Sequence, residues 1–314
     1  MDITGSQSNA IDYLRVIAMF CIIACHVCQY YENKWAWVLN TGVQIFIVIS
    51  GFLYGIRFVD DWVKWFKKRF CKLYIPFLLY ILIVFPLYYI FKREYLKPYS
   101  LLIYLLDLQG MLGGVKGLGH LWYMTAIAMC YLTTPFLQWV GTHCKNQIIL
   151  LLFIVLIALF DFLYMAGLFY PICLYAISYY LAQREVKLIR IILLVIAVIA
   201  VLIVLRWNFL PFNLGFDKSL MMIVWRSLMG LLVFSAFLFF SSFVEFGNNK
   251  GVAIMSKYSY HIYIVHHLPI LLPFSILAWN VGIITKVILL GVTVIASCIL
   301  LYKASEKICA LVKF

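Results

Sequence analysis

Two ionisable residues stand eleven positions apart within one strongly apolar stretch. Arg15 and His26 both lie in IDYLRVIAMFCIIACHVCQYY, which is long enough to cross a bilayer. Ionisable side chains at membrane depth are costly and usually functional. On an α-helix this separation returns almost to the same face and covers about 16 Å along the axis. The spacing therefore predicts that both side chains line one polar path at two depths.

An imidazole and a guanidinium can divide one reaction between them. An imidazole titrates close to neutral pH, so His26 can take a proton from a hydroxyl as a general base. Arg15 stays protonated and can hold a carboxylate, a phosphate or an anionic intermediate. A structural alternative stands beside each role. His26 can serve only to hydrogen-bond a neighbouring helix, and Arg15 can form an ion pair with Asp12, three residues earlier on the same face.

The elements that must position these residues are membrane helices. With 66% hydrophobic and 12% charged residues and a mean hydropathy of +1.02, the chain is not an ordinary soluble domain. We expect an all-α, polytopic integral membrane helical bundle with about ten transmembrane helices. Windows of about 20 apolar residues place the spans at 11–31, 36–57, 73–91, 118–140, 148–165, 167–183, 189–206, 219–242, 259–280 and 284–302. The segment 101–109 is either an interfacial helix or part of a span.

The placement of Lys and Arg predicts the orientation. With an internal N-terminus, the cytoplasmic segments carry nearly twice as many of these cations as the opposite segments, so both termini are expected in the cytoplasm. Arg15 then lies near the cytoplasmic end of its helix, and His26 lies deeper. No linker or repeat is visible, so residues 1–314 are expected to form a single membrane-embedded domain with no appended soluble domain. The first span is expected to be retained, because no Lys or Arg precedes it in the first ten residues.

The nine cysteines predict neither a disulfide framework nor a zinc site. Cys25 and Cys28 flank His26 in a C-x-x-C arrangement, but a haem-attachment motif needs the histidine after the second cysteine. A redox or metal role is the alternative to small apolar packing residues. We expect packing residues and no metal.

Four short motifs follow one another along the chain. They comprise Asp12, Tyr13, Leu14 and Arg15 with Ala18 and His26; Phe46 with Ser50, Gly51 and Phe52; Gly119, His120, Leu121, Trp122 and Tyr123; and Ser259, Tyr260, Tyr263 and His266. Their types and order resemble acyltransferase family 3, the membrane O-acyltransferases that modify bacterial cell-surface glycans. The matches extend from residue 12 to residue 266.

The resemblance implies transfer of an acyl group, usually acetyl, from cytoplasmic acetyl-CoA as donor to a sugar hydroxyl of a cell-surface polysaccharide or its lipid-linked precursor. It implies a catalytic role for His26, as general base or as a covalent acyl relay, with Arg15 as its essential partner. The expected partners are acyl-CoA, a glycan or lipid-linked sugar acceptor and membrane lipids, without nucleic acid. The expected location is the bacterial cytoplasmic membrane; the oligomeric state and the acceptor hydroxyl stay open.

The donor is expected to dock on the segment 62–72, predicted as a cytoplasmic loop. Its cations can hold the phosphates of CoA. Many family members carry Arg-x-x-Arg here, and this chain has Arg69 and Lys72, with Lys68 beside them. The alternative is that these cations only follow the positive-inside rule. Ser50 and Gly51 either permit close helix packing or approach the thioester; Ser50 is counted with the donor site.

The acceptor site is expected to include His120, Trp122, Tyr123, Arg226 and His266. Interfacial aromatics, buried hydrogen bonds, or an ion pair of Arg226 with Asp161 are the structural alternatives. His267 should point about 100° away from His266 on a helix.

Two other classes of protein share some of these features. Buried Arg and His in a bundle also fit a polytopic transporter or channel for an anionic or acylated substrate. However, the sequence shows no repeat and no pair of matching interrupted helices. A purely structural membrane partner does not account for the motifs.

Overall fold

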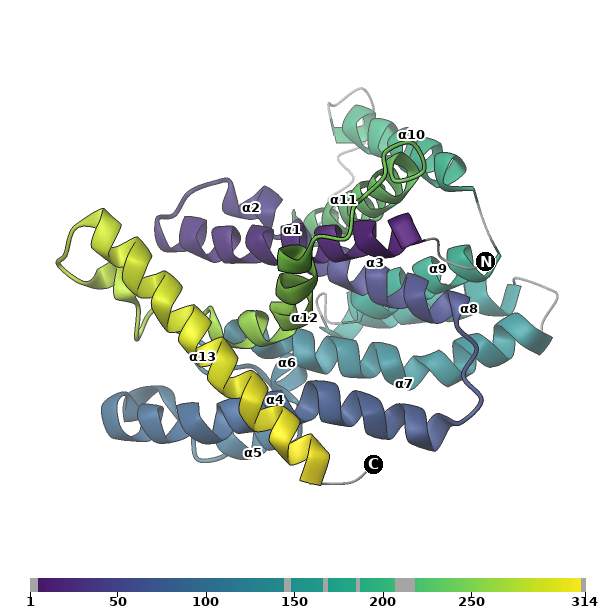
Figure 1. The fold of residues 1–314 in the computed structure, drawn as a ribbon. Coiled ribbons are helices and arrows are strands. Elements are labelled where there is room, and N and C mark those ends of the chain that lie inside the picture. Colours follow the sequence, from purple (N-terminus) through teal and green to yellow (C-terminus); the bar gives the residue numbers. More distant parts are fainter. Residues whose placement is uncertain (1–4, 144–147, 166–168, 185–186, 207–217, 312–314) are drawn as a thin grey trace. The chain divides into compact units, whose positions relative to one another are not determined.

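The computed structural model of the protein describes residues 5–143, 148–165, 169–184, 187–206 and 218–311 (Figure 1). Every regular element in these ranges is a helix, and none is a strand. The prediction of an all-α fold is therefore confirmed. Within the ranges the chain divides into two compact units, which are described separately. Unit 1 comprises the described residues within 1–21, 40–58 and 129–256, and unit 2 those within 22–39, 59–128 and 257–314.

Three helices have residues in both units: α1 (Gly5–Tyr30), α7 (Trp122–His143) and α12 (Lys250–Val265). The first of them confirms the expected helix through Arg15 and His26, since α1 is unbroken from end to end. It also means that Arg15 belongs to unit 1 and His26 to unit 2.

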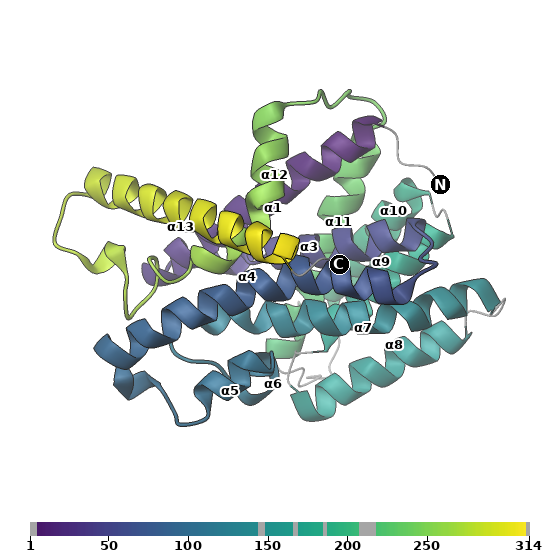
Figure 2. The ribbon, with the colours of Figure 1, turned by 60° about the horizontal axis from the view of Figure 1, so that its bottom comes forward.

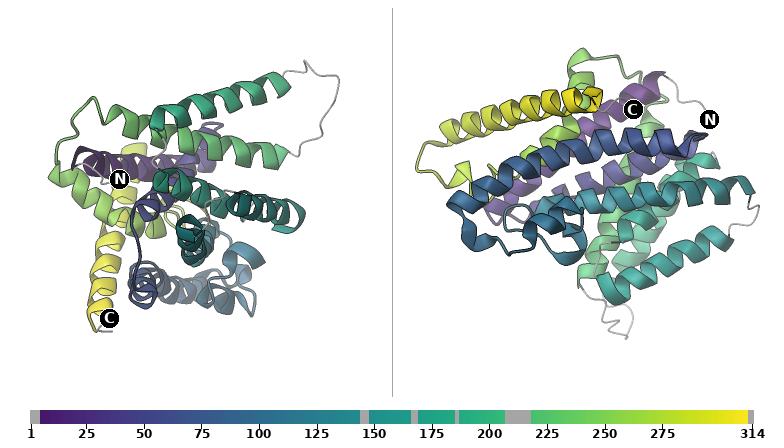
Figure 3. Two further views of the ribbon diagram at one scale, coloured as in Figure 1. Left: turned by 90° about the vertical axis from the view of Figure 1, so that its right-hand side faces the viewer. Right: turned by 90° about the horizontal axis from the view of Figure 1, so that it is seen from below.

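Five helices lie wholly in unit 1. They are α3 (Thr41–Ile56), α8 (Ile148–Phe160) with a π-helical turn (Asp161–Met165), α9 (Tyr170–Gln183), α10 (Leu188–Arg206) and α11 (Lys218–Phe240). The central helix is α3, which packs against α9 and α11. Helix α8 packs against α9, and α10 lies beside α11, as the left view of Figure 3 shows.

Two glycines let α3 approach α9 closely. A Cβ on Gly51 would lie 2.5 Å from the Tyr175 carbonyl oxygen and would overlap Ser178 Oγ, and a Cβ on Gly55 would overlap the Tyr179 carbonyl oxygen. The two glycines are four residues apart, the spacing that brings membrane helices into backbone contact. The structure thus confirms the packing alternative for Gly51.

Unit 2 is built on the pair α4 (Trp62–Phe91) and α13 (Ile283–Leu311), which pack against each other (Figure 2). Its short elements are α2 (Ala36–Leu39), η1 (Arg93–Tyr95), α5 (Ser100–Leu105), α6 (Gln109–Leu112), η2 (Gly119–Leu121) and η4 (Ile276–Ala278). The segment 101–109 is therefore neither a span nor one interfacial helix, but a short helix, a turn and the start of another.

Two predicted boundaries are wrong. Helix α4 begins at Trp62 rather than near residue 73, because Asp61 caps it by accepting a hydrogen bond from Lys64 N at 2.9 Å. The segment 62–72 is thus the start of a helix and not a loop. Helix α12 ends at Val265, so 259–280 is not one helix. Pro269 and Pro273, which lack an N–H, lie in the irregular segment that follows.

Five helical stretches among the described residues are long and apolar enough to cross a membrane. They are Gly5–Tyr30, Ala36–Ile56, Trp62–Phe91, Ile223–Phe240 and Ile283–Leu311. The count of about ten spans, the cytoplasmic termini and the single domain over 1–314 stay predictions. The predicted turn between the fifth and sixth spans lies partly outside the described residues, although α8 and α9 are separate helices.

A half-buried carboxyl group occupies the turn between α5 and α6. Asp107 has a φ of 53°, and its Oδ1 accepts hydrogen bonds from Gln109 Nε2 at 2.7 Å and from Thr125 Oγ1 at 3.2 Å. Burial raises the pKa of this carboxyl to about 6, against the opposing effect of the two hydrogen bonds. The ionised carboxylate therefore destabilises the turn at neutral pH.

We expect Asp107→Asn to stabilise the protein at neutral pH. The folded carboxyl keeps its proton up to about pH 6, whereas an unfolded Asp loses it near pH 4. The wild-type free energy of unfolding therefore falls as the pH rises through this window and stays lower above it, by roughly 3 kcal/mol at most. Asn preserves the oxygen acceptor and tolerates a positive φ.

Thermal midpoints of the detergent-solubilised proteins, measured from pH 4 to pH 8, check this expectation. The two midpoints should coincide at the acidic end and separate as the pH rises, with the variant higher. An offset that is the same at every pH would contradict the assignment of the effect to ionisation of Asp107.

Candidate active site

Four histidines from three segments form one cluster in unit 2. His26 comes from α1, His120 from η2, and His266 and His267 directly follow α12. The ring centroid of His26 lies 4.4 Å from that of His267 and 5.2 Å from that of His266. His120 stacks on His267 at 4.2 Å and lies 5.5 Å from His266. We call these four residues the imidazole cluster.

Two residues of the cluster were expected at the acceptor site, and a third was not. His266 lies beside His26, and His120 joins the cluster through His266 and His267; a contact of His120 or His266 with the acceptor stays a prediction. His267 was expected to point about 100° away from His266 on a helix continuing through residue 280. The helix ends at Val265 instead, and the His267 ring lies 4.4 Å from that of His26.

Each ring of the cluster has one nitrogen in contact with a carbonyl oxygen. The pairs are His26 Nδ1 with Gln29 Oε1 at 2.6 Å, His120 Nε2 with Ile264 O at 3.0 Å, His266 Nδ1 with Tyr263 O at 2.7 Å, and His267 Nδ1 with Gly117 O at 2.8 Å. A carbonyl oxygen can only accept, so each of these ring nitrogens donates. In a neutral ring the other nitrogen then carries a lone pair. This geometry leaves His26 Nε2 as the basic atom.

Aromatic residues support the cluster from one side. The Tyr263 hydroxyl donates to the His120 carbonyl oxygen, and the Tyr263 ring lies 5.1 Å from that of Tyr123. Tyr123 therefore acts on the cluster through Tyr263. Trp122 is half-buried next to it, and a contact of either aromatic residue with the acceptor stays a prediction.

The last of the four motifs, which extends from Ser259 to His266, packs α12 against its neighbours in unit 2. The Tyr260 hydroxyl donates to the Leu73 carbonyl oxygen of α4 at 2.5 Å, and His261 Nε2 lies 3.3 Å from Ser305 Oγ of α13. These contacts hold α12 against α4 and α13.

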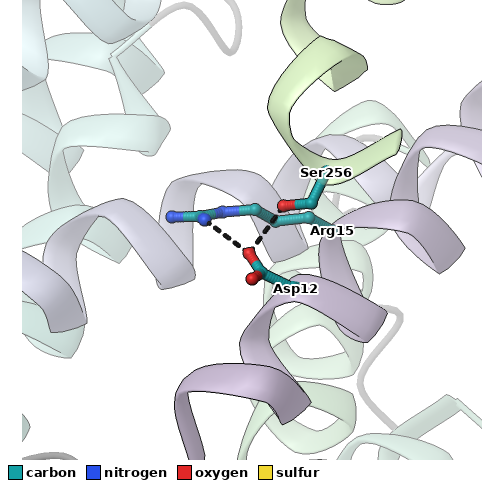
Figure 4. Close-up of polar contacts among 3 residues, drawn as sticks. All are labelled: Asp12, Arg15 and Ser256. Atoms are coloured by element: carbon teal, nitrogen blue, oxygen red, sulfur yellow. Dashed lines mark hydrogen bonds and ion pairs between the residues drawn. The ribbon is translucent and has the colours of Figure 1, made fainter. Parts of the chain in front are cut away.

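Arg15 forms the ion pair that was its structural alternative. Its Nη1 lies 3.1 Å from Asp12 Oδ1, and the same oxygen accepts a hydrogen bond from Ser256 Oγ at 2.7 Å (Figure 4). Both charged side chains are 31% exposed, so the guanidinium is not sealed off by the pair. A role for Arg15 in catalysis stays a proposal.

Cations of α4 gather with one cation of α12 in unit 2. Lys72 interacts electrostatically with Arg69 and Lys68 on its own helix, and with Lys257 of α12. Lys68, Lys72 and Lys257 are exposed, and Arg69 is half-buried, with its guanidinium 5.8 Å from the centre of the Trp65 ring. Lys257 was not among the residues predicted for the donor site. Its place one turn from Tyr260 of the last motif was the available signal.

The remaining predicted residues lie in unit 1. Ser50 is half-buried on α3 beside Gly51. Arg226 of α11 influences Tyr170 electrostatically, and the Tyr170 hydroxyl lies 2.8 Å from the Gln44 amide group. Asp161, the predicted partner of Arg226, accepts backbone hydrogen bonds from Phe169 and Tyr170 at the start of α9. Roles of Ser50 in donor binding and of Arg226 in acceptor binding stay predictions.

The sequence did not predict a metal site, and the described residues contain no set of metal ligands. Among the histidines, cysteines, aspartates and glutamates of the described ranges, no three are arranged to hold a metal ion.

Comparison with protein families identifies the chain. The family model of the acyltransferase domain, acyltransferase family 3, matches residues 8–303, which is nearly the whole chain. The chain belongs to this family and is a multi-pass membrane acyltransferase. Searches of curated proteins and of solved structures found no match.

Proposed function

We propose that the protein is an O-acyltransferase that moves an acetyl group from acetyl-CoA to a hydroxyl of a cell-surface glycan or its lipid-linked precursor, in the bacterial cytoplasmic membrane. The observation that carries the proposal is the placement of His26 Nε2, a basic atom on a ring that is oriented by Gln29 and packed against the rings of His266 and His267. Family membership supplies acyl transfer. The acetyl donor and the glycan acceptor are parts of the proposal.

The chemistry is a direct transfer. His26 Nε2 takes the proton of the acceptor hydroxyl as its oxygen attacks the thioester carbonyl carbon. A C–O bond forms, the C–S bond breaks, and the proton passes from the imidazolium to the thiolate of CoA. Arg15, about 16 Å from His26 along the same helix, is proposed to stabilise negative charge of the donor. A variant of this route passes through an acyl-His26 relay.

Acetyl transfer by the purified protein tests the proposal. Detergent-solubilised protein is incubated with acetyl-CoA labelled in the acetyl group and with membrane glycans from a host lacking the enzyme. We expect CoA release together with alkali-labile label on the glycan. Substrate flux across proteoliposomes without ester formation would instead support the transporter alternative.

We expect Arg69→Ala to weaken acetyl-CoA binding by about 10- to 100-fold, because charge-assisted hydrogen bonds to phosphate contribute roughly 1.5–3 kcal/mol. Isothermal titration with acetyl-CoA measures the loss. Arg93→Ala is the matched control, since Arg93 follows the opposite end of α4 and rests on Tyr89. Equal losses of affinity in both variants would show that acetyl-CoA binding depends on net charge and not on the cations around Arg69.

We expect Gln29→Ala to lower kcat about tenfold and to leave the KM for acetyl-CoA unchanged. The Gln29 side-chain oxygen accepts a hydrogen bond from His26 Nδ1 at 2.6 Å and so fixes the orientation and the tautomer of the ring. Gln29 has no part in the proposed binding of acetyl-CoA. One hydrogen bond of about 1 kcal/mol sets the size of the effect. Gln29→Glu, which restores an acceptor, should recover part of kcat; a change in KM alone would argue against a positioning role.

A further inference from the structure

The imidazole cluster contains buried acceptors without donors. His120 Nδ1 and His266 Nε2 are buried and have no hydrogen-bond partner. The two side chains are only 4% and 0% exposed, so bulk solvent does not satisfy them. A buried polar atom left unpaired costs about 1–3 kcal/mol. The cluster therefore holds two acceptors whose hydrogen bonds a ligand could supply.

The charge state of the rings determines what that ligand must offer. Imidazolium ions at ring separations of 4.2–5.5 Å would repel one another, so the arrangement favours neutral rings. A neutral imidazole has one donor nitrogen, and in all four rings that nitrogen faces a carbonyl oxygen. What remains for a ligand is a set of acceptors. The ligand must therefore donate hydrogen bonds.

The need for hydrogen-bond donors distinguishes the two substrates of an acyl transfer, the thioester and the acceptor alcohol. The carbonyl and thioether sulfur of a thioester accept but do not donate, and carboxylates and phosphates would meet lone pairs. Hydroxyl groups donate. The rings are close together, so one hydroxyl at His26 brings its neighbours on the same molecule near His120 or His266. His26 is only partly buried, which leaves the cluster accessible from its side.

We propose that the imidazole cluster is a polyol subsite, in which His26 takes the proton of the reacting hydroxyl while His120 Nδ1 and His266 Nε2 accept hydrogen bonds from adjacent hydroxyls. The acceptor is then an uncharged diol or polyol at the acylated position, and isolated alcohols are poor substrates. The inference rests on the proposed function for the role of His26, but the recognition of adjacent hydroxyls can be measured without catalysis.

Three small probes test the recognition. Saturation-transfer NMR on the purified full-length protein compares cis-1,2-cyclohexanediol, its monomethyl ether and cyclohexanol. The ether keeps the shape of the diol but lacks one donor. We expect the diol to bind about tenfold more tightly than either of the others, the value of one or two buried hydrogen bonds. Equal binding of the three probes would overturn the proposal, even if no variant could be produced.

Variants assign the effect to the cluster. His120→Phe and His266→Phe keep a planar ring but remove the acceptor nitrogen, and each should abolish the preference for the diol. His261→Phe is the matched control, because His261 is a buried histidine of α12 that loses one hydrogen-bond contact, with Ser305, outside the cluster. Thermal midpoints establish that each variant is folded. A diol preference that survives in both cluster variants would overturn the assignment.

The same samples separate this inference from the proposed function. Ester formation from acetyl-CoA is measured with each probe as acceptor. Equal ester yields from cyclohexanol and the diol would support acyl transfer and contradict the polyol subsite. Selective diol binding with no ester from any hydroxyl compound, glycans included, would support the subsite and contradict acyl transfer.

Discussion

Replacing His26 by alanine should lower acyl transfer by about 10²- to 10⁴-fold, the range expected for loss of a general base. The reacting hydroxyl would have to lose its proton to water, and the cluster would lose the one imidazole that is partly accessible. Binding of acetyl-CoA should change little, because the cations around Arg69 do not involve His26. Ester formation in single-turnover experiments, compared with acetyl-CoA titration, measures the two effects separately.

A second histidine provides the control for this prediction. His143, at the end of α7, is exposed and contacts Thr142 and the Trp139 carbonyl oxygen. His143→Ala should retain full activity. If a folded His26→Ala protein acylates as fast as the wild type, His26 is not the base, and the basic residue must be sought elsewhere.

Replacing Gly51 by valine should prevent stable folding of unit 1. A Cβ at this position would lie 2.5 Å from the Tyr175 carbonyl oxygen, and backbone cannot move away as a flexible side chain can. Forced overpacking of this kind costs typically 1–3 kcal/mol, and more when two helices must separate. We expect little protein in the detergent-soluble monodisperse fraction, and a lowered thermal midpoint for what remains.

Two further variants locate the cause. Gly291 also lies within a helix, α13, but a Cβ there meets nothing within 4 Å, so Gly291→Val should fold normally. Adding Ser178→Gly to Gly51→Val should restore little, because the Tyr175 carbonyl oxygen remains in place. Full rescue by that second change would mean that the serine side chain, not the backbone approach of α3 and α9, requires a glycine.

Much of the fold follows from local patterns in the sequence. Apolar windows located most helices, and the pair Gly51 and Gly55 carried the signal for the close approach of α3 and α9. The boundaries at Trp62 and Val265 were missed for different reasons. Hydropathy does not register a cap such as Asp61, which begins a helix among charged residues. Nor does hydropathy distinguish a long helix from an apolar segment that is mostly irregular, such as 266–282.

The candidate site was predictable where a short motif marked it. His26, His120 and His266 come from such motifs, whereas His267 depends on tertiary structure, because its direction changes when the helix ends one residue before His266. The contact of Gln29 with His26 could have been predicted from the sequence, because residues three apart on a helix face one another. Which ring nitrogen donates depends on the carbonyl oxygens of Gly117, Tyr263 and Ile264, and no sequence pattern specifies those contacts.

The lengths of α4 and α13 make the thickness of the lipid bilayer a variable for this enzyme. Their 30 and 29 residues correspond to about 45 Å of helix, against a hydrocarbon layer of about 30 Å. Such helices must tilt, or extend into the headgroup region, and the choice changes with the acyl-chain length of the surrounding lipids. Because α4 carries Arg69 and receives the Tyr260 hydrogen bond at Leu73, hydrophobic mismatch acts on the same helix that the donor is proposed to touch.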